Sequence, residues 1–163
     1  MRPKEACVFL VATILFACSS QDNSTAQYLN AIRPFLDPFT DAANAYTTEM
    51  DRQITLNYST MSRQQAVSLL DQSVRLIDRA LVTSKEAIAG LKTVLPPGKC
   101  KAALVAIMES LQFSEQGFTE LKSYFSLSMV GVNADKRRLE GNRLLAQADL
   151  VKIKNTSEIV ECK

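Results

Sequence analysis

The sequence predicts an all-α protein, and three observations support this fold class. Its 163 residues include only five glycines, whereas leucine, alanine, glutamine and lysine, which favour helices, are plentiful. Apolar residues recur at alternating steps of three and four positions, the heptad rhythm of helices that pack side by side. The breaks between these segments are short, so consecutive helices are expected to be antiparallel neighbours. The predicted architecture is an antiparallel up-down-up-down four-helix bundle after a cleaved signal peptide.

The first predicted helix carries two prolines within its apolar stripe. Pro34 and Pro38 each remove a backbone hydrogen bond, which costs about 3 kcal/mol in a helix interior. The stripe nevertheless continues through both. We therefore expect either one kinked helix or a short helix followed by a longer one that is capped by Asp37. The stripe consists of Leu29, Ile32, Leu36, Phe39, Ala43, Tyr46 and Met50.

The second and third stripes are bounded by helix start and stop signals. Ser62 and Gln65 have the spacing of a capping box. The residues Pro96-Pro97-Gly98 end the second helix, because proline lacks the amide hydrogen, and Gly131 ends the third. The second stripe is Val67, Leu70, Val74, Ile77, Leu81, Ser84, Ile88, Leu91 and Leu95, and the third is Leu104, Ile107, Leu111, Ser114, Phe118, Leu121 and Phe125.

Ser84 and Ser114 occupy positions where an apolar residue is usual. We expect each hydroxyl to bond a carbonyl one turn back in its own helix, and a small polar pocket is the alternative. The fourth stripe is weaker than the others, and Asn133 with Asp135 suits the start of its helix. It consists of Leu139, Asn142, Ala146, Leu150 and Ile153.

The N-terminus has the pattern of an export signal. Arg2 and Lys4 precede an apolar run at positions 6–17, as in peptides that direct a chain across a membrane. This run is too short to span a bilayer, which takes about 20 apolar residues. We divide the chain into a signal peptide at 1–17, a tether at 18–25 and one helical domain at 26–163, and we place the mature protein outside the cytoplasm.

The cleavage region Leu15-Phe16-Ala17-Cys18 resembles the lipobox of bacterial lipoproteins. In that family the cysteine becomes the acylated N-terminus, so the resemblance implies that Cys18 carries a lipid that holds the protein on a membrane. Phe16 is bulkier than the family's usual residue, and ordinary signal cleavage between Ala17 and Ser19 is the competing interpretation. The segment 95–100, followed by a helix, is also similar to small extracytoplasmic helical lipoproteins of bacteria, a resemblance that implies no activity or ligand.

Two further cysteines remain in the mature chain. Cys100 precedes the third predicted helix and Cys162 follows the fourth. Since these positions lie at the same end of an antiparallel pair, and thiols become oxidised outside the cytoplasm, we predict a disulfide between them. A metal or redox pair is disfavoured because the two are far apart in sequence and the chain has no histidine to assist.

The absence of histidine argues against many enzyme classes. It removes the usual general base at neutral pH, the commonest zinc ligand and the proximal haem ligand. The chain also lacks the paired Glu-x-x-His motifs of di-iron bundles, the Gly-x-Ser-x-Gly elbow of hydrolases and the glycine-rich loops that bind phosphate. We therefore expect no enzymatic activity, no metal and no cofactor.

Charge and surface patterning bear on partners. Without Arg2, Lys4 and Glu5, 17 basic residues face 16 acidic ones, so the balance gives no reason to expect nucleic-acid binding. The polar clusters 75–79 and 136–138 are expected to be solvated helix faces. The tip opposite the tether combines apolar residues that suit a docking partner, an unidentified envelope protein. These residues are Tyr58, Met61, Met129, Val130 and Val132.

The sequence therefore predicts a membrane-anchored extracytoplasmic lipoprotein that serves as a non-enzymatic binding or structural module of the cell envelope. The alternative is a secreted eukaryotic glycoprotein, because Asn23, Asn57 and Asn155 each begin an Asn-x-Ser/Thr triplet that accepts glycans in such proteins. An enzyme with an unrecognised carboxylate-based site is the third interpretation.

Overall fold

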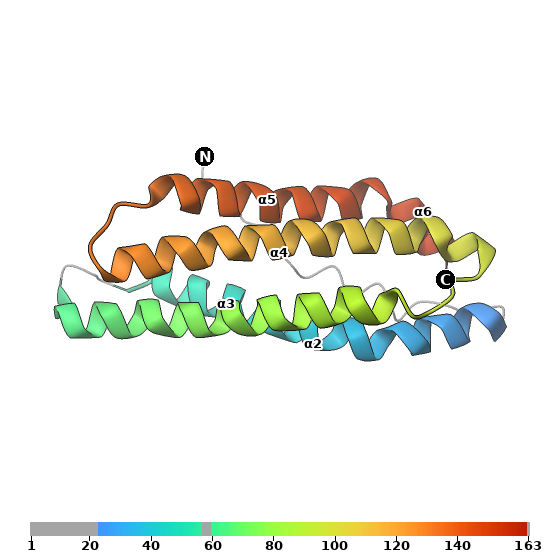
Figure 1. Cartoon of the computed structure of the whole chain (residues 1–163), viewed down its shortest axis with the longest axis horizontal. Coiled ribbons are helices and arrows are strands. Elements are labelled where there is room, and N and C mark those ends of the chain that lie inside the picture. Colours follow the sequence, from blue (N-terminus) through green and yellow to red (C-terminus); the bar gives the residue numbers. More distant parts are fainter. Residues whose placement is uncertain (1–22, 57–59, 163) are drawn as a thin grey trace.

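The computed structural model describes residues 23–56 and 60–162. This part of the chain is helical and contains no β-strand, which confirms the predicted all-α class. Consecutive long helices run in opposite directions along the molecule (Figure 1). The elements are α2 (Asn23–Ile54), α3 (Arg63–Leu91), η2 (Gly98–Cys100), α4 (Lys101–Met129), α5 (Asp135–Lys154) and α6 (Thr156–Glu161).

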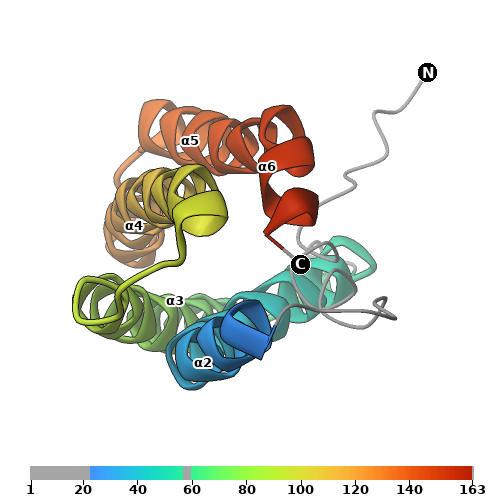
Figure 2. The ribbon, with the colours of Figure 1, turned by 90° about the vertical axis from the view of Figure 1, so that its right-hand side faces the viewer.

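The four long helices pack in chain order. α2 lies against α3, α3 against α4, and α4 against α5. α2 and α5 do not form a packed pair. In the view along the helices they occupy two corners of the bundle, and α6 is drawn on the side between them (Figure 2). A four-helix bundle has four interfaces between neighbouring helices. Three of them are packed here, and the interface between α2 and α5 is not.

α2 is one continuous helix that includes both prolines, so the alternative of two separate helices is wrong. Its apolar face is long enough to hold the segment together, because Ile32, Leu36 and Phe39 are all buried on either side of the prolines. Tertiary packing of such a face stabilises a helix more than local propensity does. The helix also begins at Asn23, so it includes the last three residues of the segment that we expected to be a tether.

The predicted start of α3 and the predicted end of α4 agree with the local structure, whereas α3 ends at Leu91, before Leu95 and the Pro96-Pro97-Gly98 segment that we expected to end it. Ser62 accepts a hydrogen bond from the backbone of Gln65, and the side chain of Gln65 accepts one from the backbone of Ser62, which completes the predicted capping box. α4 ends two residues before Gly131, which has φ of +79°, a conformation that glycine adopts at no steric cost. The oxygen of the Asn133 side chain then accepts a hydrogen bond from the backbone of Asp135 at the start of α5.

The stripes of α2, α3 and α4 supply most of the core. Val67 and Leu95, the two ends of the second predicted stripe, are exceptions, since they are 36% and 92% exposed. The fourth predicted stripe is wrong. Leu139, Leu150 and Ile153 are 63%, 52% and 58% exposed, and Asn142 and Ala146 are exposed as well. The face of α5 that is buried consists of Gly141, Leu144, Ala148 and Val151. α5 turns this face to α4, as shown by the 3.0 Å hydrogen bond from Ser110 Oγ to the carbonyl of Ala148.

Cys100 and Cys162 lie at disulfide-bond distance. Their sulfur atoms are 2.09 Å apart and both residues are almost completely buried. The pair connects η2 to the residue that follows α6, and it lies at the end of the molecule where α2 begins (Figure 1). It holds the last short helix against the main body.

Candidate functional site

The open side of the molecule contains a groove of about 530 Å³. α2 and α5 form its two walls and α4 forms its floor. This volume falls within the range of about 300–1,000 Å³ that is typical of small-molecule sites. The floor includes Ser114, Phe118, Leu121 and Phe125; the α2 wall includes Phe39, Ala43, Tyr46, Met50 and Asp51; and the α5 wall includes Arg138, Asn142, Leu145, Ala146, Asp149 and Lys152.

The sequence of α5 explains why the groove stays open. The side of α5 that faces it is mostly polar, because Arg138, Asp149 and Lys152 are charged and Asn142 is an amide. Arg138 is 47% exposed, and removing its charge from water to pack it on α2 would cost several kcal/mol. Small side chains at Ala43 and Ala146 also leave space between the walls.

The floor of the groove is aromatic and firmly packed. Phe118 is buried, and it contacts two rings of α2 edge to face, Phe39 at 6.5 Å and Tyr46 at 5.4 Å between ring centroids. At the other end of the floor, the rings of Tyr124 and Phe125 lie 5.0 Å apart. Such pairs contribute about 0.5–1.5 kcal/mol beyond their burial, so the surface offered to a guest is apolar and rigid.

The charged groups along the walls differ in how exposed their ion pairs are. Lys152 Nζ lies 3.4 Å from Asp149, and both side chains are less than one quarter exposed. Arg138 lies 3.4 Å from Asp135 in a pair that is about half exposed, and its guanidinium carbon is 5.9 Å from the centroid of the Tyr124 ring. Arg138 is therefore the cation of the groove that is most accessible to a ligand.

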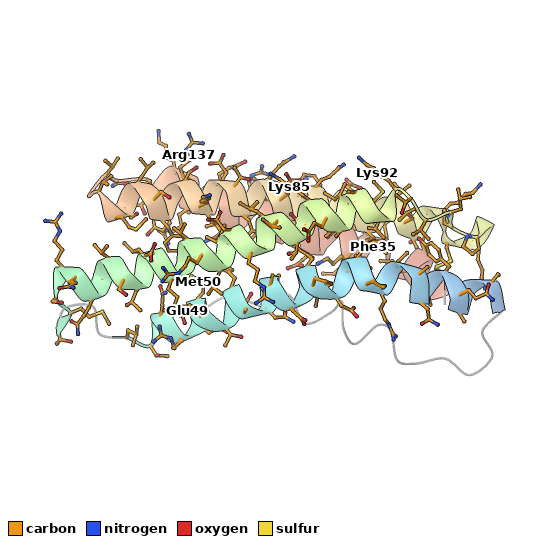
Figure 3. All side chains as sticks on the ribbon, turned by 60° about the horizontal axis from the view of Figure 1, so that its bottom comes forward. Phe35, Glu49, Met50, Lys85, Lys92 and Arg137 are labelled. Carbon is orange, nitrogen blue, oxygen red and sulfur yellow. A yellow bond between two sulfur atoms is a disulfide. The ribbon has the colours of Figure 1, made fainter. Side chains whose placement is uncertain are left out.

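A buried polar network joins α2 to α3 beside the groove. The side-chain nitrogen of Gln53 donates to Glu49 and to Ser73, at 2.9 Å in each case. Arg52 Nε also donates to Glu49, at 2.8 Å, and this hydrogen bond holds the pKa of the Glu49 carboxyl below its ordinary value of 4.5. Glu49 and Met50 project from the same part of α2 (Figure 3). Since its polar groups are satisfied within the network, we assign the cluster to the α2–α3 contact.

Comparisons with known proteins assign no family. No family model matches the chain, and neither a curated protein nor a solved structure gives a significant match. Function must therefore be argued from the groove and from the ends of the molecule.

The residues predicted to carry function fall in different places. Cys18 and Tyr58 lie outside the described residues. Val130 and Val132 are 71% and 50% exposed, while Met61 and Met129 are partly buried. The α2–α3 and α4–α5 connections lie at the same end of the molecule, as expected (Figure 1). The exposed apolar surface of this tip also includes Ile54, which is 71% exposed.

The two stripe serines behave as the simpler expectation predicts. Ser84 Oγ donates to the carbonyl of Leu81 at 3.0 Å, and Ser114 Oγ donates to that of Ser110 at 2.9 Å. Ser114 nevertheless lines the groove, although its hydroxyl hydrogen bonds within its own helix. Neither hydroxyl is directed at a partner that would make it a nucleophile.

The polar clusters are dispersed into surface ion pairs. Asp78 pairs with Lys122 at 2.6 Å, and Arg137 pairs with Glu120 at 2.8 Å. Arg137 lies on the opposite side of the molecule from α2 (Figure 3).

In the described residues, 23–56 and 60–162, no group of three or more acidic, cysteine or histidine side chains is placed to hold a metal ion. In the same ranges, no helix is both long enough and apolar enough to cross a bilayer.

The groove was not predicted from the sequence. A signal existed in the heptad-spaced positions 138, 142, 145, 149 and 152 of α5, where only Leu145 is apolar. A helix face of this kind cannot pack against a neighbouring helix in a way that excludes water. The distance between α2 and α5, however, depends on how two intervening helices pack, and no local pattern gives it.

Proposed function

We propose that this protein is a bacterial membrane-anchored lipoprotein whose mature domain, an antiparallel up-down-up-down four-helix bundle with one open seam, is a non-enzymatic binding module of the cell envelope. The single observation that carries the binding role is the aromatic-floored groove between α2 and α5. Concave, mainly apolar surfaces with a few polar groups at the edge are the usual form of a ligand site.

The position of the anchor orients the groove. α2 begins five residues after Cys18, so an acylated Cys18 holds the start of this helix close to the membrane. The 32 residues of α2 rise about 48 Å. The groove is lined by the second half of α2, from Phe39 to Ile54, and therefore lies in the half of the domain farther from the membrane.

The polar groups of the groove support a binding role over catalysis. Covalent catalysis requires a nucleophile within hydrogen-bond reach of a base. The hydroxyls of Thr40 and Ser114 instead donate to the carbonyls of Leu36 and Ser110 in their own helices. The groove thus offers shape and apolar area, with charge confined to its edges.

Asn155 bears on the alternative of a glycoprotein. Its side-chain nitrogen, the atom that would carry a glycan, donates to the carbonyl of Val151 at 2.7 Å and closes the end of α5. An N-linked glycan replaces one of the two amide hydrogens and the other can keep this hydrogen bond, so the experiment below is what separates the glycoprotein from the lipoprotein.

Metabolic labelling with a palmitate analogue tests the anchor. Label is expected on the wild-type protein and is expected to be lost in Cys18→Ala. A wild-type protein without label, or one whose mobility changes after glycosidase treatment, contradicts the anchor and supports the glycoprotein.

A neutral fluorescent probe, N-phenyl-1-naphthylamine, tests the groove. Its fluorescence should rise with the wild-type protein and not with Ala146→Trp, which places a large side chain on an exposed position of the α5 wall. Ala89→Trp is the matched control, because Ala89 is an exposed alanine of α3 outside the groove. Equal fluorescence for all three proteins contradicts a binding groove.

A further inference from the structure

We propose that the groove binds a long-chain amphiphile with an anionic head, with the hydrocarbon chain on the aromatic floor and the head at Arg138. This inference rests on the proposed function, since it names the ligand of the same groove. Three features carry it: the length of the groove, the apolar nature of its floor, and the placement of its accessible cation.

The groove is long. Arg138 and Lys152 line it at its two ends along α5, and fourteen residue steps correspond to about 21 Å of helix. A groove of this length and of about 530 Å³ has room for one extended hydrocarbon chain.

The apolar side chains of the groove suit a hydrocarbon. Phe118, Leu121 and Phe125 of the floor and Phe39 of the α2 wall are buried and offer only ring and alkyl atoms. The hydroxyl of Ser114, the polar residue among them, donates within its own helix. Burial of each methylene group contributes about 0.8 kcal/mol. Binding should therefore strengthen with chain length until the chain fills the groove.

The charges favour an anionic head at one end. Lys152 is 18% exposed and paired with Asp149, whereas Arg138 is 47% exposed and has only the solvent-exposed Asp135 at 3.4 Å. The face of Tyr124 lies beside the Arg138 guanidinium, which fixes the cation at the rim. A guanidinium binds carboxylate or phosphate through paired hydrogen bonds. Asp51 is exposed on the opposite wall and repels an anion, so the head is directed toward α5.

Four twelve-carbon ligands that differ only in the head test this assignment: laurate, dodecyl phosphate, dodecyl maltoside and dodecyltrimethylammonium, each below its micelle concentration. They compete with N-phenyl-1-naphthylamine for a chain from Ser19 to Lys163, which retains every helix of the structure. The two anions should bind at least ten times more tightly than the cation. Comparison of laurate with dodecyl phosphate distinguishes a fatty acid from a phospholipid-type head.

Variants of the rim make the test specific. Arg138→Gln should weaken both anions about tenfold, the effect of losing a charge-assisted hydrogen bond, and should leave dodecyl maltoside unchanged. Asp51→Asn should strengthen the anions. Arg143→Gln is the control, since Arg143 pairs with Glu140 at 2.7 Å and does not line the groove.

The outcomes separate the two proposals. If the probe and all four ligands bind but Arg138→Gln changes nothing, or the cation binds as tightly as the anions, the anionic head is refuted and the binding groove stands. If neither the probe nor any ligand binds the wild-type chain, the groove has no apolar guest and both proposals fail.

Discussion

Gly117 of α4 and Gly141 of α5 face each other where the two helices cross. A Cβ atom placed on either glycine would lie 3.0 Å from the carbonyl oxygen of the other. The absence of side chains at this point lets α5 lie close on α4, and it also commits the small-residue face of α5 to that contact. The charged side of α5 is then left facing α2, which is why the close crossing and the open groove occur together.

Gly141→Ala should destabilise the protein in spite of the better helix propensity of alanine. The added Cβ would lie 2.7 Å from Leu121 Cγ as well as 3.0 Å from the backbone of α4, and overpacking of this kind costs about 1–3 kcal/mol. Thermal unfolding followed by circular dichroism should show a lower Tm. Gly98→Ala is the control, because nothing lies within 4 Å of its added Cβ, and a similar loss in both variants would argue against a close crossing.

Gly90 and Phe35 provide a second test of close packing. A Cβ on Gly90 of α3 would overlap the ring of Phe35 of α2, whose side chain lies between the two helices (Figure 3). Gly90→Ala should therefore cost about 1–3 kcal/mol of unfolding free energy in the wild type and clearly less in a Phe35→Leu background. A double-mutant cycle in urea measures the difference. Additive effects would show that the two residues do not interact.

Removal of the pair Cys100 and Cys162 should lower stability without unfolding the long helices. Closing a loop of 62 residues contributes about 4 kcal/mol in the chain-entropy model. The double variant Cys100→Ala/Cys162→Ala should unfold at lower urea concentration, and adding a reductant should bring the wild type close to the variant. A wild-type protein that a reductant does not affect would contradict a disulfide in the native chain.

Glu49 should make stability depend on pH at the acidic end. Its folded pKa is lowered by the Arg52 hydrogen bond, so this contribution is complete above the ordinary value of 4.5 and is lost as the pH falls through the folded pKa. Because Arg52 is half exposed, the contribution is about 1 kcal/mol. Glu49→Gln should lose stability at pH 7 and approach the wild type as the pH falls from 4.5 through the lowered folded pKa of Glu49. A constant difference between the two proteins over this range would exclude the linkage. Glu86→Gln, at an exposed position of α3, is the control.

Periodicity located the helices because burial of a continuous apolar face dominates their stability. In α2 this face overrides two prolines, and at Ser62 the capping box marks the helix start. The same rhythm was ambiguous in α5, which has two stripes of similar spacing. The larger side chains of Leu139, Leu150 and Ile153 pointed to the wrong stripe. Small residues formed the core instead, since close approach of helices depends on the absence of side-chain bulk.

The groove and the surface of the tip depend on distances that a single sequence does not give. Heptad positions specify that helices pack. The distance between α2 and α5, however, is the combined result of the α2–α3, α3–α4 and α4–α5 contacts. Cys100 and Cys162 were predictable because antiparallel order alone brings them to one end. The place of Arg138 at the groove was not predicted, because its sequence neighbours make it part of a basic cluster, whereas the adjacent Arg137 pairs with Glu120 of α4.

The assignment of the two faces of α5 can be tested directly. Leu144 is 6% exposed and packs toward α4, while Leu150, one of the residues in the predicted stripe, is 52% exposed. Leu144→Ala should therefore cost about 2–5 kcal/mol, whereas Leu150→Gln should change the unfolding free energy by less than about 0.5 kcal/mol. Urea unfolding of the two variants measures both values. If Leu150→Gln proved as costly as Leu144→Ala, the outer stripe of α5 would be buried in the native protein, and the helix would have to be turned so that its charged side no longer borders the groove.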